Sequence, residues 1–173
     1  LGGSFVSLLI QRKRIHMDHG IIGSSDMDEA GKVMATIQAS IVTPIMYKMV
    51  HTETLPKLME KKIAQMDDSK KKLVNGFLDM FGLGGSWITK KSIYNQFYSD
   101  LVTKVQHNID VPNTKIHVFY AIKMGKKYEK RYYTYFKNPD IHRFNMQHEE
   151  LFCCHANKWI EEVRNVVIGD VGL

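Results

Sequence analysis

The chain has 173 residues, of which 44% are hydrophobic and 24% charged, and this composition suits one domain with a sizeable core and excludes wholesale disorder. The net charge is +6, but the lysines stand in short groups separated by acids, a pattern more typical of solvated helix faces than of a nucleic-acid-binding stripe. No apolar run approaches the roughly 20 residues that cross a bilayer, and no signal-peptide pattern is found, so we expect a cytoplasmic protein with no nucleic-acid partner and no membrane span.

The first part, residues 1–27, has the pattern of a helix followed by a short strand. Apolar residues between 5 and 10 precede the cations of 12–14, which complement the dipole at a helix C-terminus. A brief apolar run bounded by glycines then covers 19–25 and predicts a buried strand that runs into a loop. This alternation is typical of a parallel α/β sheet.

The middle part, residues 28–111, predicts helices and no strand. Asp28 is a candidate N-cap for a first helix, which Pro44 is expected to bend or end. Apolar residues three or four positions apart are expected to form one face of this helix: Val33, Met34, Ile37, Ile41 and Ile45.

Further helices are expected over 55–66, 69–81 and 87–105, the last of them with Ser86 as its N-cap after a glycine-rich breaker. The whole middle part is therefore interpreted as a helical insertion.

The last part, residues 112–173, returns to alternating strands and helices. A β-rich run at 115–121 is followed by a helix over 126–135, a strand at 141–144, a polar turn and a helix over 157–167. The predicted fold class is α/β, with three parallel strands and an inserted helical unit.

The two cysteines are the neighbours Cys153 and Cys154. Adjacent cysteines rarely bridge each other, and no CxxC pair offers a zinc site. We therefore expect two reduced thiols, no metal ion and no cofactor.

His148 is the candidate general base, because it stands in the turn between the last strand and the last helix, held by rigid elements yet open to solvent. The other histidines lie beside or inside strands and helices and are interpreted as structural or solvent-exposed: His16, His19, His51, His107, His117, His142 and His155.

Two motifs resemble the α/β-hydrolase family. The opening Leu1-Gly2-Gly3-Ser4-Phe5 is similar to the segment that follows the serine of the nucleophile elbow. His148, followed by Trp159 and Val163, is similar to the ending that carries the catalytic histidine, although Gln147 stands where glycine is usual.

The resemblance implies the C-terminal part of an α/β-hydrolase sheet, with 28–111 as a helical cap over an acyl-substrate site. It places the nucleophile serine directly before Leu1, and it makes the backbone N–H of Leu1 an oxyanion-hole donor. It also implies that the N-terminal half of the fold is present as another segment or chain.

The acid of the triad has no obvious candidate, because no carboxylate stands directly after the strand 115–121. Asp26 could orient the imidazole from the end of the preceding strand, and Glu129 is a second possibility. A dyad or an inactive site is the third. The function predicted from the resemblance is therefore a serine hydrolase, with a non-catalytic ligand- or partner-binding protein of the same fold as the alternative.

Overall fold

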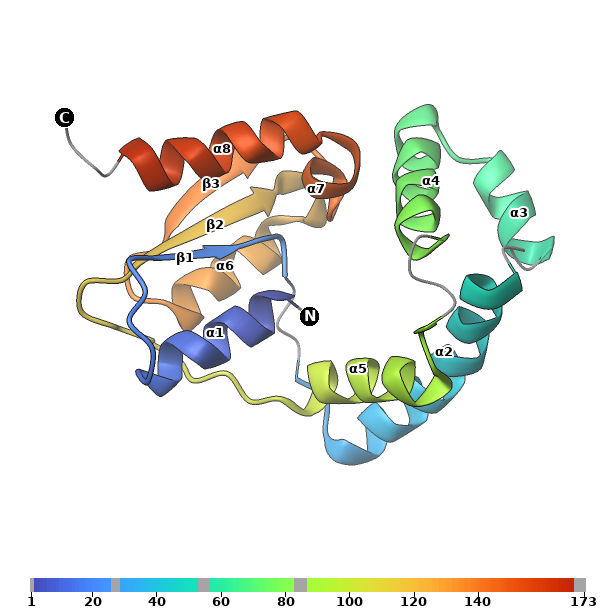
Figure 1. Cartoon of the computed structure of the whole chain (residues 1–173), viewed down its shortest axis with the longest axis horizontal. Helices are drawn as coiled ribbons and strands as arrows, with labels where there is room; N and C mark the ends of the chain where they lie inside the picture. Colours follow the sequence, from blue (N-terminus) through green and yellow to red (C-terminus); the bar gives the residue numbers. More distant parts are fainter. Residues whose placement is uncertain (1, 26–28, 53–56, 83–86, 170–173) are drawn as a thin grey trace. The chain divides into compact units, whose positions relative to one another are not determined.

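The computed structural model describes residues 2–25, 29–52, 57–82 and 87–169. The chain forms two compact units, the first made of Leu1–Met27 with Lys104–Leu173 and the second of Asp28–Thr103 (Figure 1). The expected insertion, 28–111, spans the second unit and the first residues after it.

The first unit contains a three-stranded sheet of β1 (His19–Ile22), β2 (Lys115–Ala121) and β3 (Asp140–Phe144). The strands lie in the order β1-β2-β3, and both pairs are parallel. The predicted α/β class with three parallel strands is thus confirmed.

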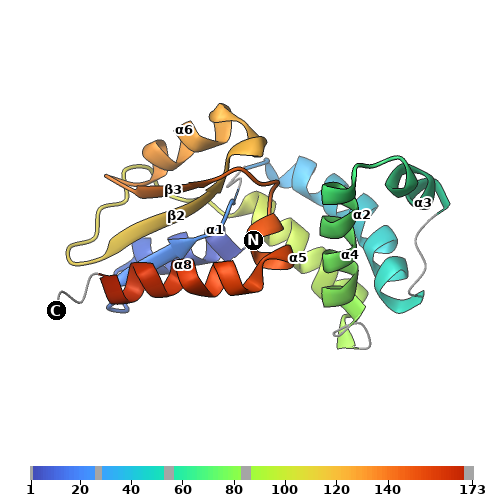
Figure 2. The same ribbon diagram turned by 90° about the horizontal axis from the view of Figure 1, so that it is seen from above.

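Helices cover both faces of this sheet, as a parallel sheet requires. Figure 1 shows α1 (Gly2–Arg12) and α6 (Lys126–Tyr135) on one side of the strands and α8 (Ala156–Gly169) on the other. The short helix α7 (Glu150–Cys154) precedes α8. Figure 2 shows the same sheet from above, with β2 and β3 side by side.

The side chains of β2 alternate between the two faces. Val118 and Tyr120 belong to a buried cluster with Ile10 of α1 and Tyr132 of α6. Phe119 points to the other face, in a second cluster that is completed by residues of β3, α7 and α8, namely Phe144, Leu151 and Val166. The period of two therefore divides the core into two layers.

In its described residues the second unit has helices and no strand. It contains α2 (Lys32–Thr52), α3 (Lys57–Ala64), α4 (Asp68–Gly82) and α5 (Lys90–Val102). Pro44 does not end the first helix, one of the two effects predicted for it, because α2 continues to Thr52. The proposed caps Asp28 and Ser86 lie outside the described residues.

Helix α5 begins at Lys90, so the predicted start at residue 87 is wrong. The reason is a reciprocal cap: Thr89 Oγ1 accepts a hydrogen bond from the Ser92 N–H at 3.0 Å, and Ser92 Oγ accepts one from the Thr89 N–H at 2.9 Å. This capping box satisfies two N–H groups at the start of the helix.

The face that α2 buries carries three small residues and Val50. Ala35, Ala39 and Thr43 are buried, and α2 packs against α5. The apolar residues whose spacing predicted the helix are all exposed: Val33, Met34, Ile37, Ile41 and Ile45. The buried face of α2 is therefore not the one that the apolar spacing predicts.

By length and composition, α2 could also cross a membrane, with a mean hydropathy of 1.3 over Lys32–His51 and 22% of that stretch buried. No charged residue stands between Lys32 and Lys48. A core helix of a soluble protein or a signal sequence has the same properties, so the expected lack of a membrane span stays a prediction.

Candidate functional site

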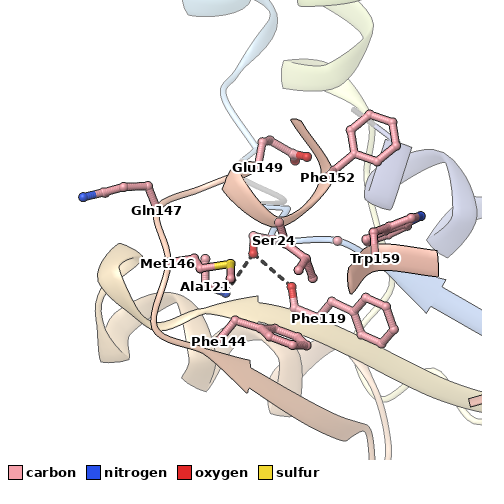
Figure 3. A pocket seen from close by; sticks show the side chains of 11 residues that line it. Ser24, Phe119, Ala121, Phe144, Met146, Gln147, Glu149, Phe152 and Trp159 are labelled. Atoms are coloured by element: carbon pink, nitrogen blue, oxygen red, sulfur yellow. Dashed lines mark hydrogen bonds between the residues drawn. The ribbon is translucent and has the colours of Figure 1, made fainter. Parts of the chain in front are cut away.

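The carboxyl ends of all three strands lie at one edge of the sheet, and a small cavity lies there (Figure 3). Its volume is about 20 Å³, enough for a single water molecule. Apolar side chains from β2, β3, α7 and α8 line most of it, including Phe119, Phe144, Phe152 and Trp159. The cavity is therefore too small to hold an acyl substrate by itself.

Ser24 closes one side of this cavity and has a structural role. Its buried hydroxyl donates to the carbonyl of Phe119 at 2.9 Å and accepts from the N–H of Ala121 at 2.8 Å (Figure 3). These bonds fix the chain after β1 to the end of β2. Because the Oγ is committed to two backbone groups, Ser24 is not a candidate nucleophile.

His148 lies in the turn after β3, as predicted. The side chain is 50% exposed, and its Nε2 lies 3.7 Å from Oε1 of Glu149. Gln147 and Glu149 line the small cavity, whereas the lining residues that the structure describes do not include His148. The imidazole is therefore accessible from solvent beside the cavity rather than inside it.

The turn that carries His148 is tied down by its neighbours. The carboxylate of buried Glu150 accepts a hydrogen bond from the Gln147 N–H at 2.7 Å. Glu149 adopts the left-handed conformation with φ of 61°, which is uncommon outside glycine. A strained residue and an internal tether are typical of turns that hold a side chain in one place.

Of the two carboxylates proposed to orient the imidazole, the structure describes only Glu129. Asp26 lies outside the described residues, as does Leu1, the expected source of the oxyanion-hole N–H. Glu129 accepts a hydrogen bond from Arg143 Nε at 2.8 Å, an interaction that raises the pKa of Arg143, and it thereby connects α6 to β3. Within the described residues, the carboxylate beside His148 is that of Glu149, which the sequence did not lead us to expect.

Cys153 and Cys154 follow one another in α7, and the thiol of Cys153 is a poor nucleophile. Burial, with smaller contributions from Glu149 and Cys154, raises the pKa of Cys153 to about 11. The thiolate is the reactive form, so at pH 8 its population is about 100-fold lower than for a thiol with the ordinary value of 9.0.

We therefore expect iodoacetamide to alkylate Cys153 about 100-fold more slowly at pH 8 than it alkylates a model cysteine peptide. The rate should rise with pH until about pH 11, because the thiolate population grows tenfold with each pH unit below the pKa. Mass spectrometry of timed digests in a Cys154→Ser variant measures this. A rate that levels off near pH 9 contradicts the assignment.

No protein family, curated protein or solved structure matches the chain in the comparisons made. The functional interpretation therefore depends on the geometry of the sheet unit and on the resemblance of its two motifs.

Proposed function

We propose that the sheet unit is the histidine-bearing part of a serine hydrolase of the α/β-hydrolase type, acting on an ester or related acyl substrate. The observation that carries this proposal is the position of His148, in the turn after the last strand of a parallel sheet whose strands are arranged in sequence order. Ligands of open parallel α/β sheets bind at the carboxyl ends of the strands. The hydrolase triad follows the chain order nucleophile, acid, histidine, with which this position agrees.

In the proposed reaction, the imidazole of His148 takes the proton of the attacking serine hydroxyl and later gives it to the leaving group. The serine is the residue before Leu1 in the elbow pattern, and the Leu1 N–H stabilises the oxyanion. Asp26 is the proposed orienting acid. Oε1 of Glu149, 3.7 Å from Nε2, is the described carboxylate beside this imidazole.

The test uses the longest natural form of the polypeptide. We expect a fluorophosphonate probe to label the serine before Leu1 and the protein to hydrolyse short p-nitrophenyl esters. His148→Gln should lower kcat by about 10²- to 10⁴-fold, the usual contribution of a general base.

His155→Gln is the matched control, because His155 also has a glutamate oxygen at 3.7 Å, that of Glu150, but lies at the end of α7. It should retain the parent rate. Absence of both a serine adduct and ester hydrolysis contradicts the proposal and favours the alternative, a non-catalytic binding protein. An unchanged kcat in His148→Gln removes His148 from the mechanism.

A further inference from the structure

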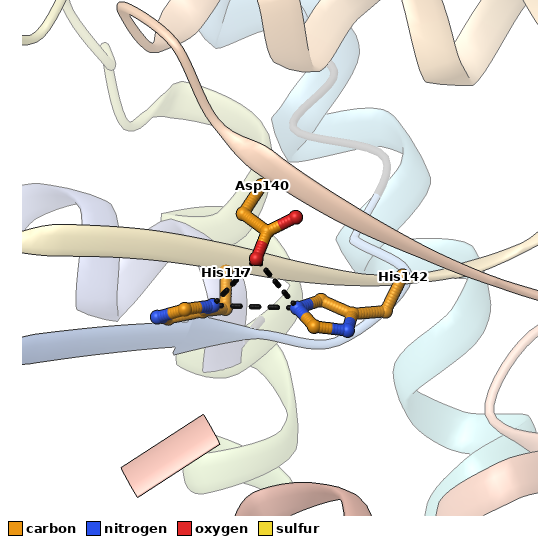
Figure 4. Close-up of side chains that lie close together, drawn as sticks. All are labelled: His117, Asp140 and His142. Carbon is orange, nitrogen blue, oxygen red and sulfur yellow. Dashed lines mark hydrogen bonds and ion pairs between the residues drawn. The ribbon is translucent and has the colours of Figure 1, made fainter. Parts of the chain in front are cut away.

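A second group of titratable side chains lies on the sheet, away from the His148 turn. His117 of β2 and two residues of β3, Asp140 and His142, direct one ligand atom each toward a common point (Figure 4). His117 Nδ1 lies 3.3 Å from His142 Nε2 and 3.3 Å from Asp140 Oδ2, and the last two atoms are 3.1 Å apart.

The register of the sheet explains why these residues meet. Asp140 is the partner of His117 in the β2–β3 pair, and His142 is the partner of Phe119. Residues two apart on a strand share a face, so Asp140 and His142 point to the same side. Since Asp140 begins β3 whereas His148 follows its carboxyl end, the group is separate from the proposed catalytic site.

The separations agree with those of metal ligands. Bonds of about 2.0–2.1 Å to a tetrahedral ion place ligand atoms about 3.3–3.4 Å apart. All three separations here, from 3.1 to 3.3 Å, are close to this value. Two imidazoles and one carboxylate are also a donor set that divalent first-row transition metals accept.

A neighbouring histidine holds one of the three side chains in place, and the group is open to solvent on one side. His117 Nε2 lies 3.3 Å from His19 Nδ1, a contact that fixes the ring with Nδ1 directed at the common point. Metal-binding histidines usually donate this second ring N–H to a carboxylate, a backbone carbonyl or a water, and here His19 Nδ1 stands in that place. Side-chain exposure increases from 6% at His117 to 27% at His142 and 63% at Asp140, which leaves one side open for a water or exchangeable ligand.

We propose that His117, Asp140 and His142 bind one divalent transition-metal ion, with Zn²⁺ as the representative ion, and that His19 orients His117 from behind. The ion joins β2 to β3 at the start of β3 and stabilises the sheet by binding only the folded chain. This site departs from the expectation of no metal, which considered only cysteine motifs and treated the strand histidines one at a time.

The test is a titration of the metal-free 173-residue chain with Zn²⁺ against a chromogenic chelator, with Co²⁺ as a spectroscopic probe. We expect one equivalent to bind, a visible Co²⁺ d–d spectrum with nitrogen and oxygen ligands, and a Tm that rises with Zn²⁺. Asp140→Asn and His142→Gln should each weaken binding more than 100-fold. His19→Gln should weaken it about 10- to 100-fold, the usual effect of an outer partner.

The control is His51→Gln in α2, whose ring bonds to the Tyr47 carbonyl at 3.0 Å; its affinity should equal that of the parent. Asp140→Asn conserves shape at an exposed position, and circular dichroism in chelator should show it folded like the parent. Absence of stoichiometric binding overturns the proposal and leaves a hydrogen-bonded group in which Asp140 accepts from both imidazoles. Equal affinity of the parent, Asp140→Asn and His142→Gln overturns it as well, by placing the ion elsewhere.

Discussion

Replacing Phe136 with alanine is expected to lower the free energy of unfolding by about 3–5 kcal/mol, the usual cost of truncating a buried aromatic side chain. Phe136 is 1% exposed and packs in the cluster that contains Val118 and Tyr132. Its backbone N–H donates to the Tyr132 carbonyl at 2.9 Å where α6 ends, and the residue forms a parallel bridge with Ile109. The substitution therefore opens a cavity at the junction of α6 and the sheet, as urea unfolding followed by circular dichroism should show.

Phe5→Ala is the matched control, because Phe5 is 62% exposed on α1. The same atoms are removed, but little buried surface is lost and alanine is the better helix former. We expect a change of less than about 1 kcal/mol, as is usual for surface positions. Equal losses in Phe136→Ala and Phe5→Ala contradict the placement of Phe136 in the core.

The best-predicted elements were those whose own residues determine both ends. The strand over 115–121 and the helix over 126–135 have the predicted bounds. The strand is a β-rich run after a Pro-Asn turn. The helix follows Gly125, whose φ of 97° interrupts the preceding backbone. Local turn chemistry and side-chain periodicity were sufficient here.

Other features depend on contacts that periodicity does not record. Helix α7 has five residues, which is too short for a helical repeat to be recognised. The start of α5 was decided by competition between polar residues for the N-cap, and Thr89 with Ser92 forms the box. The buried face of α2 is set by the tertiary packing of the helix, and it differs from the face that the apolar spacing predicts.

The two candidate sites also differ in whether local sequence is enough to predict them. The turn of His148 could be located from the sequence, because a strand, a turn and a helix follow one another locally. The group of His117, Asp140 and His142 could not, because it requires the register between β2 and β3. A shift of that register by one residue would send one strand's side chains to the other face.

Replacing Gly3 with alanine is expected to lower the free energy of unfolding by about 1–3 kcal/mol, the typical cost of overpacking. A Cβ at Gly3 would lie 2.5 Å from the Ser25 Cβ and 3.0 Å from the Ile22 Cγ2, and would overlap the Ser25 Oγ. Ser25 is itself buried, and its carbonyl accepts the hydroxyl of Tyr132 at 2.5 Å, so the segment cannot move away freely. The close approach of α1 to the end of β1 therefore requires glycine, a requirement that also agrees with the proposed elbow.

Gly169→Ala in α8 makes the same chemical change where a new Cβ meets no atom within 4 Å. It should leave stability unchanged or raise it by up to about 1 kcal/mol, because alanine restricts the unfolded chain. Ser25→Gly removes the atoms nearest to the new methyl group, so it should cost less in the Gly3→Ala background than in the parent. Additive losses in this double-mutant cycle, measured by urea unfolding, would mean that the two residues are not in contact and that α1 does not approach β1 as described.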